Sequence, residues 1–447
     1  MNTSTRVSVR SRVMQAVPAV LASGLVLVVG SASGAHSTRE NWSAPVPVAH
    51  GHPALAANLT IDGSGTAIAS WEFDAGLWMS RRPAGGSWSK PTYVDPDASS
   101  GSSGRAPTGQ LAVDPLGNAC VLYTSFYLRE LRVACLDRDG TLTPPHTLAS
   151  QGRQPHVQLV VDASGTWTAG WIQRQKGRTW VDISRRAPSG TWTLPHRISA
   201  PSHAASSLQL ATTPGGAATA VWASKPQNNP KAGARILTST RTHSTAWSKA
   251  TPISPPHSER PSLAGGTHRR VLVTWIHSRG GSAVVQVRQC HGITWGSVRT
   301  VSAPAFRPIR FGQPHVAVGG RGVAVAGWRK FGAWCGNHTR AYAAVFEHGR
   351  WQAVTPLTRE AARVNMTATY SDPVFTVDSR GTVHSFVVRN NDLQARKHRV
   401  DTSWRTGVSI GRSNSDYGQP PSPALSPTGK PAVLWLHLET MQFSEQS

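Results

Sequence analysis

The chain has 447 residues, and its 46 Lys and Arg residues against 22 Asp and Glu residues give a formal net charge of +24 at pH 7. Its many glycines (41) and prolines (32) suit a fold of tight turns and disfavour one built on long helices. The positive charge is spread along the whole chain, so it predicts either attraction to anionic surfaces such as wall polymers, acidic glycans or lipid headgroups, or only a soluble, arginine-rich composition.

Residues 1–35 are predicted to be a signal peptide. Three arginines among the first twelve residues form a positive n-region, residues 17–29 form a short apolar stretch, and Ser33-Gly34-Ala35 offers small residues for cleavage. The apolar stretch is shorter than a comfortable membrane span, so we expect cleavage, with an uncleaved anchor as the alternative. No later apolar run is long enough to span a membrane. Residues 36–447 are therefore expected to form one secreted, soluble and monomeric domain.

The next feature along the chain is a repeat of about fifty residues, a length typical of propeller blades. A turn glycine is followed six residues later by an aromatic residue that ends a small and apolar run. These pairs are Gly65/Trp71, Gly117/Tyr123, Gly165/Trp171, Gly216/Trp222, Gly322/Trp328 and Gly429/Trp435, with Gly381/Val387 and Arg269/Trp275 as divergent members. A second series runs out of phase with the first: Trp42, Trp88, Leu142, Trp192, Trp247, Trp295, Trp351 and Trp404. Two interleaved series with one period predict a β-propeller.

The first full repeat can be divided into four strands. Residues 55–61 form the first strand, and Asp62-Gly63-Ser64-Gly65 is a type I turn in which the Asp side chain caps the backbone. Residues 66–71 and 77–82 form the second and third strands, and the fourth begins at Trp88. The tryptophans of the two series are expected to pack between blades, and the Asp residues of these turns to be structural, so neither set is assigned to binding.

The strand order predicts how the ring closes. The second series has eight members, and the chain opens with a fourth strand at residues 42–48 and ends after a third strand near residues 440–443. We therefore predict an all-β fold, a single β-propeller of eight four-stranded blades, whose N-terminal strand completes the last blade and removes an exposed edge. Seven blades is the alternative, if the divergent repeat around Val387 is not a blade.

Four cysteines fit an oxidising compartment. Cys120 and Cys135 lie in two strands of one predicted hairpin, and we expect a disulfide between them. Cys290 and Cys335 lie in neighbouring repeats and are a further candidate pair. None of the four shows metal-ligand spacing, so no metal or other cofactor is expected.

The turns between third and fourth strands resemble the Asp-box (BNR) repeat of sialidase-like propellers, whose pattern is S-x-D-x-G-x-x-W. Residues 82–88, 186–192 and 289–295 keep a Gly and the Trp but lack the Ser and the Asp. The chain also resembles the secreted propeller-repeat proteins of high-GC Gram-positive bacteria over residues 36–447. The resemblance implies a fold more than an activity. The family's F/Y-R-I-P motif has only a late and misordered counterpart at residues 306–309, so the catalytic residues remain unknown.

Binding is predicted on one face of the propeller. The loops after second and fourth strands are long and irregular, and propeller topology places them together, where variable loops on a rigid scaffold usually bind. Trp334 belongs to neither series and lies among Arg329, Lys330 and His338, a set that suits contact with a glycan or an anionic polymer. The alternative is a loop packed by its own tryptophan.

The sequence Gln-Pro-His-Val occurs at residues 154–157 and again at 313–316. Each copy begins a predicted first strand, so His156 and His315 are expected near the mouth of the central channel, where they could bind a ligand or a metal. The alternative is that the motif is a remnant of repetition without a role.

These observations predict a secreted, non-catalytic propeller that binds a glycan or an anionic cell-surface polymer. An exported protein rarely meets nucleic acid, so nucleic acid is not an expected partner. One alternative is a glycan-degrading hydrolase or lyase with a divergent site, and another is a protein-interaction scaffold. Two carboxylates, or a carboxylate with a Tyr or His, converging within about 5–10 Å at the channel mouth would favour the enzyme.

Overall fold

A computed structural model of the chain describes residues 41–49, 55–73, 76–96, 98, 109–125, 128–150, 156–188, 190–229, 231–242, 246–267, 270–307, 309–332, 339–359, 370–413, 420–437 and 440–446. The predicted signal peptide, residues 1–35, lies outside the described residues. All described elements belong to one compact unit, Glu40–Ser447.

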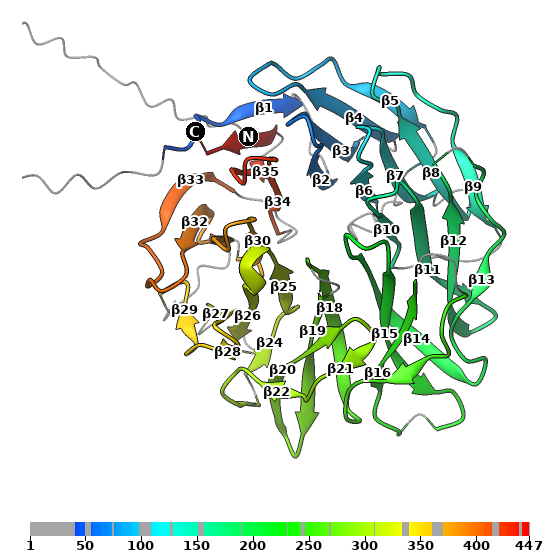
Figure 1. Ribbon diagram of the computed structural model, residues 1–447, viewed down its shortest axis with the longest axis vertical. Coiled ribbons are helices and arrows are strands. Elements are labelled where there is room, and N and C mark those ends of the chain that lie inside the picture. Colours follow the sequence, from blue (N-terminus) through cyan, green and yellow to red (C-terminus); the bar gives the residue numbers. More distant parts are fainter. Residues whose placement is uncertain are drawn as a thin grey trace, which may run out of the picture. The chain divides into compact units, whose positions relative to one another are not determined.

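The unit is an eight-bladed β-propeller, as the two sequence series predict (Figure 1). Blade 1 contains β2 (Leu55–Ile61), β3 (Ala67–Phe73), β4 (Gly76–Arg82) and β5 (Thr92–Asp95), and blade 2 contains β6 (Gln110–Val113), β7 (Ala119–Ser125), β8 (Glu130–Leu136) and β9 (His146–Ala149). Blade 3 contains β10 (Gln158–Val161), β11 (Trp167–Gln175), β12 (Arg178–Arg186) and β13 (His196–Arg197). Blade 4 contains β14 (His203–Thr212), β15 (Ala218–Pro226), β16 (Arg235–Arg241) and β17 (Thr251–Pro252).

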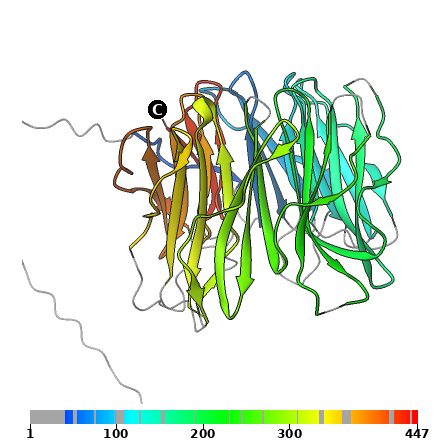
Figure 2. The same ribbon diagram turned by 60° about the horizontal axis from the view of Figure 1, so that its bottom comes forward.

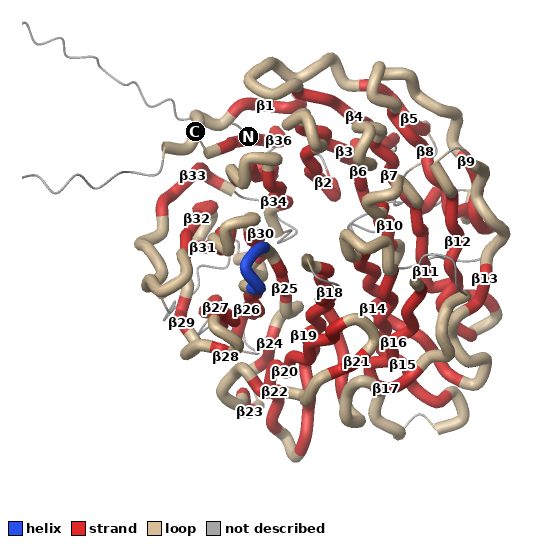
Figure 3. Tube along the Cα trace, in the orientation of Figure 1, coloured by secondary structure: helices blue, strands red, loops and turns tan. Residues whose placement is uncertain are grey.

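Blades 5 and 6 differ because some of their strands are divided into short segments. Blade 5 consists of β18 (Ser258–Gly265), β19 (Arg270–Arg279) and β20 (Ser282–His291), with β21 (Thr294–Trp295), β22 (Arg299–Thr300) and β23 (Ala305–Phe306) along its outer edge. Blade 6 consists of β24 (Arg310–Phe311), β25 (His315–Val318), β26 (Ala324–Phe331), β27 (Arg340–Glu347), β28 (Arg350–Trp351) and β29 (Thr355–Pro356). A short 3-10 turn, η1 (Gly320–Gly322), joins β25 to β26 and is the helical element drawn in Figure 3.

The last two blades confirm the predicted closure of the ring. Blade 7 contains β30 (Val374–Val377), β31 (Val383–Arg389), β32 (Asp392–His398) and β33 (Val408–Arg412), and blade 8 contains β34 (Ser422–Leu425), β35 (Pro431–His437), β36 (Thr440–Glu445) and the N-terminal strand β1 (Val46–Ala49). The divergent repeat around Val387 is a complete blade, so the seven-blade alternative is wrong. The innermost strands contact each other in succession around the ring, and β34 contacts β2.

The hydrophobic core is divided among the interfaces between blades. Trp171 of blade 3 is fully buried against Leu122 and Leu131 of blade 2, and Trp275 of blade 5 against Val221 of blade 4. The predicted packing role of the first aromatic series is thereby confirmed. In the turn between β2 and β3, Asp62 accepts hydrogen bonds from the backbone N–H groups of residues 64 and 66 at 2.9 and 2.8 Å.

The strand order also sorts the turns onto two faces. Within each antiparallel blade, the turn from first to second strand and the turn from third to fourth strand lie at the same edge. The turn from second to third strand and the connection to the next blade lie at the opposite edge. Figure 2 shows the strands crossing the thickness of the ring between these edges. We call the edge with the turns from first to second and from third to fourth strands the short-turn face, and the opposite edge the long-loop face.

The predicted Cys120–Cys135 disulfide is present between directly opposed residues of β7 and β8. In the chain-entropy description, a loop of this size stabilises the fold by about 3 kcal/mol. The second candidate pair is not formed, because Cys290 is a buried free thiol, and Cys335 lies outside the described residues. Burial raises the pKa of Cys290 to about 11, so its thiol stays protonated and unreactive at neutral pH.

Acid is expected to destabilise the fold through His384. This residue of β31 is 3% exposed, and burial, followed by the nearby Lys397, lowers its pKa to about 4. Between that pKa and the ordinary value near 6.5, the unfolded chain takes up a proton that the folded chain does not, so stability falls as the pH falls through this window. The loss from pH 7.5 to pH 5 should be roughly 2 kcal/mol.

Urea unfolding of the wild type and of His384→Gln at these two pH values measures this contribution. His156, His277 and His315 also have pKa values lowered by burial and act in the same direction, so the test is the difference between the two proteins. The variant should lose roughly 2 kcal/mol less than the wild type on acidification. Equal losses in both proteins would contradict this assignment.

Candidate binding site

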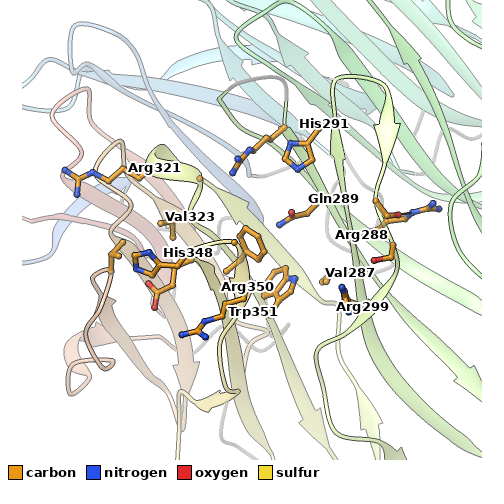
Figure 4. A pocket seen from close by; sticks show the side chains of 18 of the residues that line it. Val287, Arg288, Gln289, His291, Arg299, Arg321, Val323, His348, Arg350 and Trp351 are labelled. Carbon is orange, nitrogen blue, oxygen red and sulfur yellow. Dashed lines mark hydrogen bonds between the residues drawn. The ribbon is translucent and has the colours of Figure 1, made fainter.

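A cavity of about 990 Å³ opens on the short-turn face between blades 5 and 6 and reaches blade 7 at Val400 and Asp401. Five arginines line it, and two of them lie on either side of an aromatic side chain in Figure 4. We call this cavity the arginine groove, defined by Arg270, Gln289, His291, Arg299, Arg321, His348, Arg350 and Trp351.

Two tight turns place the blade 6 side chains along the groove. β27 and β28 are joined by His348 and Gly349, whose φ angles of 51° and 76° are those of a type I′ hairpin turn. The turn leaves His348 and Arg350 exposed at the edge of the sheet. In the other turn Gly320 approaches the backbone of blade 7 so closely that a β-carbon would collide with the carbonyl oxygen of Ser379. This turn presents Arg321, with φ of 54°, at the rim.

The strand alternation of β20 divides its side chains between the two sides of blade 5. Gln289 points from β20 into the space between blades 5 and 6 (Figure 4). Arg288 points the other way, where its Nε donates to Gly296 O at 2.6 Å and its Nη1 to Ile253 O at 2.9 Å. The Arg288 guanidinium therefore joins blade 5 to blade 4 by hydrogen bonds, and it points away from a ligand in the groove.

The four remaining arginines carry charge that the protein leaves uncompensated. The guanidinium groups of Arg270, Arg299, Arg321 and Arg350 make no hydrogen bond or ion pair with any other residue in the described part of the chain. Arg270 reaches from blade 5 to blade 6, where its Nη1 lies against Gly322. Guanidinium groups stay protonated at all physiological pH values, so the groove is a permanently cationic site.

The two carboxylates that line the groove are both engaged with histidines of neighbouring segments. Glu347, which is buried, lies 3.3 Å from Nε2 of His398 and ties blade 6 to blade 7. Asp401 lies 2.8 Å from Nε2 of His348, and this pair is exposed. Both acids are therefore paired with a histidine, and of the two pairs only Asp401–His348 is exposed in the groove.

Trp351 gives the groove an apolar wall. Its indole packs edge to face on Phe346, with ring centroids 5.5 Å apart, and remains partly exposed. In Figure 4 it lies between Arg299 and Arg350. A partly exposed aromatic face flanked by guanidinium groups suits a ligand that carries anionic groups on a ring with an apolar face, such as an acidic sugar.

The residues predicted around Trp334 are only partly described. Trp334 and His338 lie outside the described residues. Arg329 is a structural residue, because its Nε lies 2.9 Å from Oδ1 of Asp372 and the pair joins blade 6 to blade 7. Lys330 is half-buried next to it in β26. Binding at this loop stays a prediction.

The two Gln-Pro-His-Val segments occupy different structural positions. Gln158 pairs with Gly170, whereas His315 pairs with the corresponding glycine of blade 6, Gly327. His156 therefore lies two positions before the site that His315 occupies, and the motif is not a structural repeat. No cluster of three metal-ligating side chains occurs among the described residues, and ligand binding by either histidine stays a prediction.

Among the described residues, Tyr123 and Asp95 form a tyrosine–carboxylate pair that is buried inside the fold. Tyr123 donates to Oδ2 of Asp95 at 2.5 Å, and Nη1 of Arg132 lies 3.0 Å from the same oxygen. Asp95 is 1% exposed and Tyr123 is fully buried at the interface between blades 1 and 2. A substrate cannot reach this cluster, and its role is to join the two blades.

No protein-family profile matches the chain, and no curated protein matches it in sequence. Solved structures share its fold at low identity. A puromycin hydrolase is 14% identical, with a TM-score of 0.49, over 87% of this chain and 59% of its own length, so the chain spans about three fifths of that protein. An ulvan lyase is 10% identical over 89% of this chain and 95% of its own, with a TM-score of 0.49. A sialidase from Streptococcus pneumoniae is 10% identical over 92% and 93%, with a TM-score of 0.41. These likenesses concern the fold alone.

The arginine groove is absent from the sequence-based prediction, which favoured the opposite face. A signal for it exists in the turns. Blades 1, 2, 3 and 7 have Asp at the start of the turn between first and second strands, whereas blades 4, 5, 6 and 8 have Thr213, Gly266, Gly319 and Ser426. Blade 6 alone among these has an arginine, Arg321, at a described position within the turn. The missing acids are therefore a weak signal, and Arg321 is the sharper one.

Proposed function

We propose that this chain is a secreted, non-catalytic propeller whose arginine groove binds an anionic glycan or cell-surface polymer. The observation that carries the proposal is the set of four guanidinium groups around one cavity that have no partner among the described residues. Arginine matches carboxylate, sulfate and phosphate groups with paired hydrogen bonds, and such charge-assisted contacts are stronger than neutral ones. Other arginines, such as Arg288 and Arg329, are held by hydrogen bonds or ion pairs within the protein.

Two further observations support the extracellular part of the proposal. The first residues have the composition of a signal peptide, and the Cys120–Cys135 disulfide is of a kind that persists in oxidising compartments. None of the described helices has the length and hydropathy to cross a bilayer. An extracellular protein of this charge meets wall polymers and acidic glycans as its most abundant anions.

Binding to dextran sulfate, with uncharged dextran as the reference, tests the proposal directly. The wild-type chain should bind dextran sulfate and not dextran, and the affinity should fall steeply with added salt, because exposed charges are screened beyond about 8 Å at physiological ionic strength. Arg299→Gln with Arg350→Gln should weaken binding by about a hundredfold or more, since each of the two lost charge-assisted hydrogen bonds contributes about 1.5–3 kcal/mol.

The matched control replaces two exposed arginines of blade 3, Arg174→Gln with Arg178→Gln, and removes the same charge elsewhere. This variant should bind nearly as well as the wild type. Both variants should keep the wild-type melting temperature, because none of the four side chains bonds to another described residue. Equal weakening in the two double variants would show that binding follows net charge alone and would contradict a site in the groove.

A further inference from the structure

A second group of unpaired arginines lies at the other end of blade 5. It lines a cavity of about 480 Å³ between the turn at residues 279–282 and the connection at residues 305–311, and one exposed acid, Glu259, lies on the same cavity. Arg279, Arg307 and Arg310 are exposed, and in the described part of the chain their guanidinium groups have no hydrogen-bond or ion-pair partner. We call this group the loop-face cluster, because it lies on the long-loop face.

The local backbone holds this cluster in a defined shape. Gly280 and Gly281, with φ angles of 57° and 80°, form the type I′ turn that joins β19 to β20 and carries Arg279 on its flank. The connection that contains Arg307 and Arg310 is tied back to blade 5, because Nη1 of Arg260 donates to Phe311 O at 3.3 Å. β23 pairs with β20 in the same region. The three arginines are therefore presented by a hydrogen-bonded scaffold.

The same strand connects the two cationic sites. Ser282 and Ala283, at the start of β20, line the cavity of the loop-face cluster, and Val287 to His291, at its end, line the arginine groove. A strand rises by about 3.3 Å per residue, so the two ends of this ten-residue strand are about 30 Å apart. The sites therefore lie toward opposite ends of β20, with the body of blade 5 between them.

We infer that the protein holds two anionic polymer chains at once, one on each face, and so cross-links them. The inference rests on the proposed function of the arginine groove and adds a second binding site and a bridging activity. Both sites present unpaired guanidinium groups, so they take ligands of the same chemical class, polymers with carboxylate, sulfate or phosphate groups. Their separation prevents a short ligand from occupying both.

Calorimetric titration with a sulfated oligosaccharide too short to reach from one face to the other gives the stoichiometry. The wild-type chain should bind two molecules. The triple variant Arg279→Gln, Arg307→Gln and Arg310→Gln should bind one, and the groove variant Arg299→Gln with Arg350→Gln should also bind one. The control variant Arg174→Gln with Arg178→Gln should still bind two. Circular dichroism and unfolding midpoints establish that every variant is folded.

Capture on a surface coated with dextran sulfate tests the cross-linking itself. Surface-bound wild-type protein should retain labelled dextran sulfate from solution. The triple variant and the groove variant should each still bind the surface but retain at least tenfold less label. A stoichiometry of one for the wild type, unchanged in the triple variant and lost in the groove variant, would overturn the inference and leave the proposed function intact. Absence of any binding to the sulfated oligosaccharide and to the coated surface would overturn the proposed function and the inference with it.

Discussion

A chain that begins at Gly51 is expected to lose most of the stability of the propeller, because this truncation removes the strand that closes the ring. β1 pairs with β36 in blade 8, with Val46 opposite Phe443, and Trp42 packs edge to face on Phe386 of blade 7 at 5.8 Å. Without these residues the edge of β36 and the apolar surface beneath Trp42 face water. The loss should be roughly 5 kcal/mol or more, because removing one large aromatic side chain from such a position alone costs about 3–5 kcal/mol.

The reference for this experiment is a chain that begins at Asn41 and keeps β1. Denaturant unfolding followed by tryptophan fluorescence compares the two, and light scattering detects association through the exposed edge. Trp42→Phe in the longer chain should cost much less than Trp42→Ala, because phenylalanine preserves the edge-to-face contact. If the chain from Gly51 unfolds at the same denaturant concentration as the chain from Asn41, closure by β1 contributes little and the expectation is wrong.

Replacing Asp95 by alanine is expected to destabilise the fold by roughly 3 kcal/mol, because it removes the acceptor from a buried polar cluster. Asp95 accepts hydrogen bonds from Tyr123 and Arg132 across the interface between blades 1 and 2, and it is almost fully buried. In the variant, the tyrosine hydroxyl and part of the guanidinium group stay buried without this carboxylate. Urea unfolding of the variant and the wild type measures the difference.

Two further variants separate this cluster from a general effect of charge. Asp401→Ala removes a carboxylate from the exposed pair with His348 and should change stability by less than about 1 kcal/mol. Tyr123→Phe combined with Asp95→Ala removes the Tyr123 hydroxyl as well, so the double variant should cost less than the sum of the two single changes. An effect of Asp95→Ala no larger than that of Asp401→Ala would show that the buried cluster does not hold the blades together.

The arginine groove and the loop-face cluster both involve blade 5. Residues of β20 and of its outer edge segments line both cavities, Arg299 and Thr300 of β22 on one side and Ala305 of β23 on the other. In blades 1 and 3, by contrast, Asp62 and Asp162 cap the turn between first and second strands.

The sequence by itself determined the fold, because the signals for it are local. In seven of the eight blades a glycine with positive φ, such as Gly65 or Gly165, ends the first turn, and in most blades an aromatic residue six positions later is buried between blades. The hairpin of β7 and β8 is equally local, so the pairing of Cys120 with Cys135 follows from the strand positions alone. The closing strand is also readable, since the chain opens with a fourth strand and has no fourth strand at its end.

Only the tertiary structure decided where arginine side chains come together and which of them lack a partner. Arg270, Arg299, Arg321 and Arg350 are up to eighty positions apart, and they meet only because blades 5 and 6 pack side by side with the same edge outward. Whether an arginine is free depends on its neighbours in space: Arg329 has Asp372 of the next blade within 2.9 Å, and Arg299 has no such partner among the described residues. Strand register is likewise not specified by the local sequence. His156 and His315 belong to identical motifs, but relative to the neighbouring strand they occupy positions two residues apart. Strand periodicity is a property of a short segment, whereas the pairing of charges depends on contacts between segments that the local pattern does not specify.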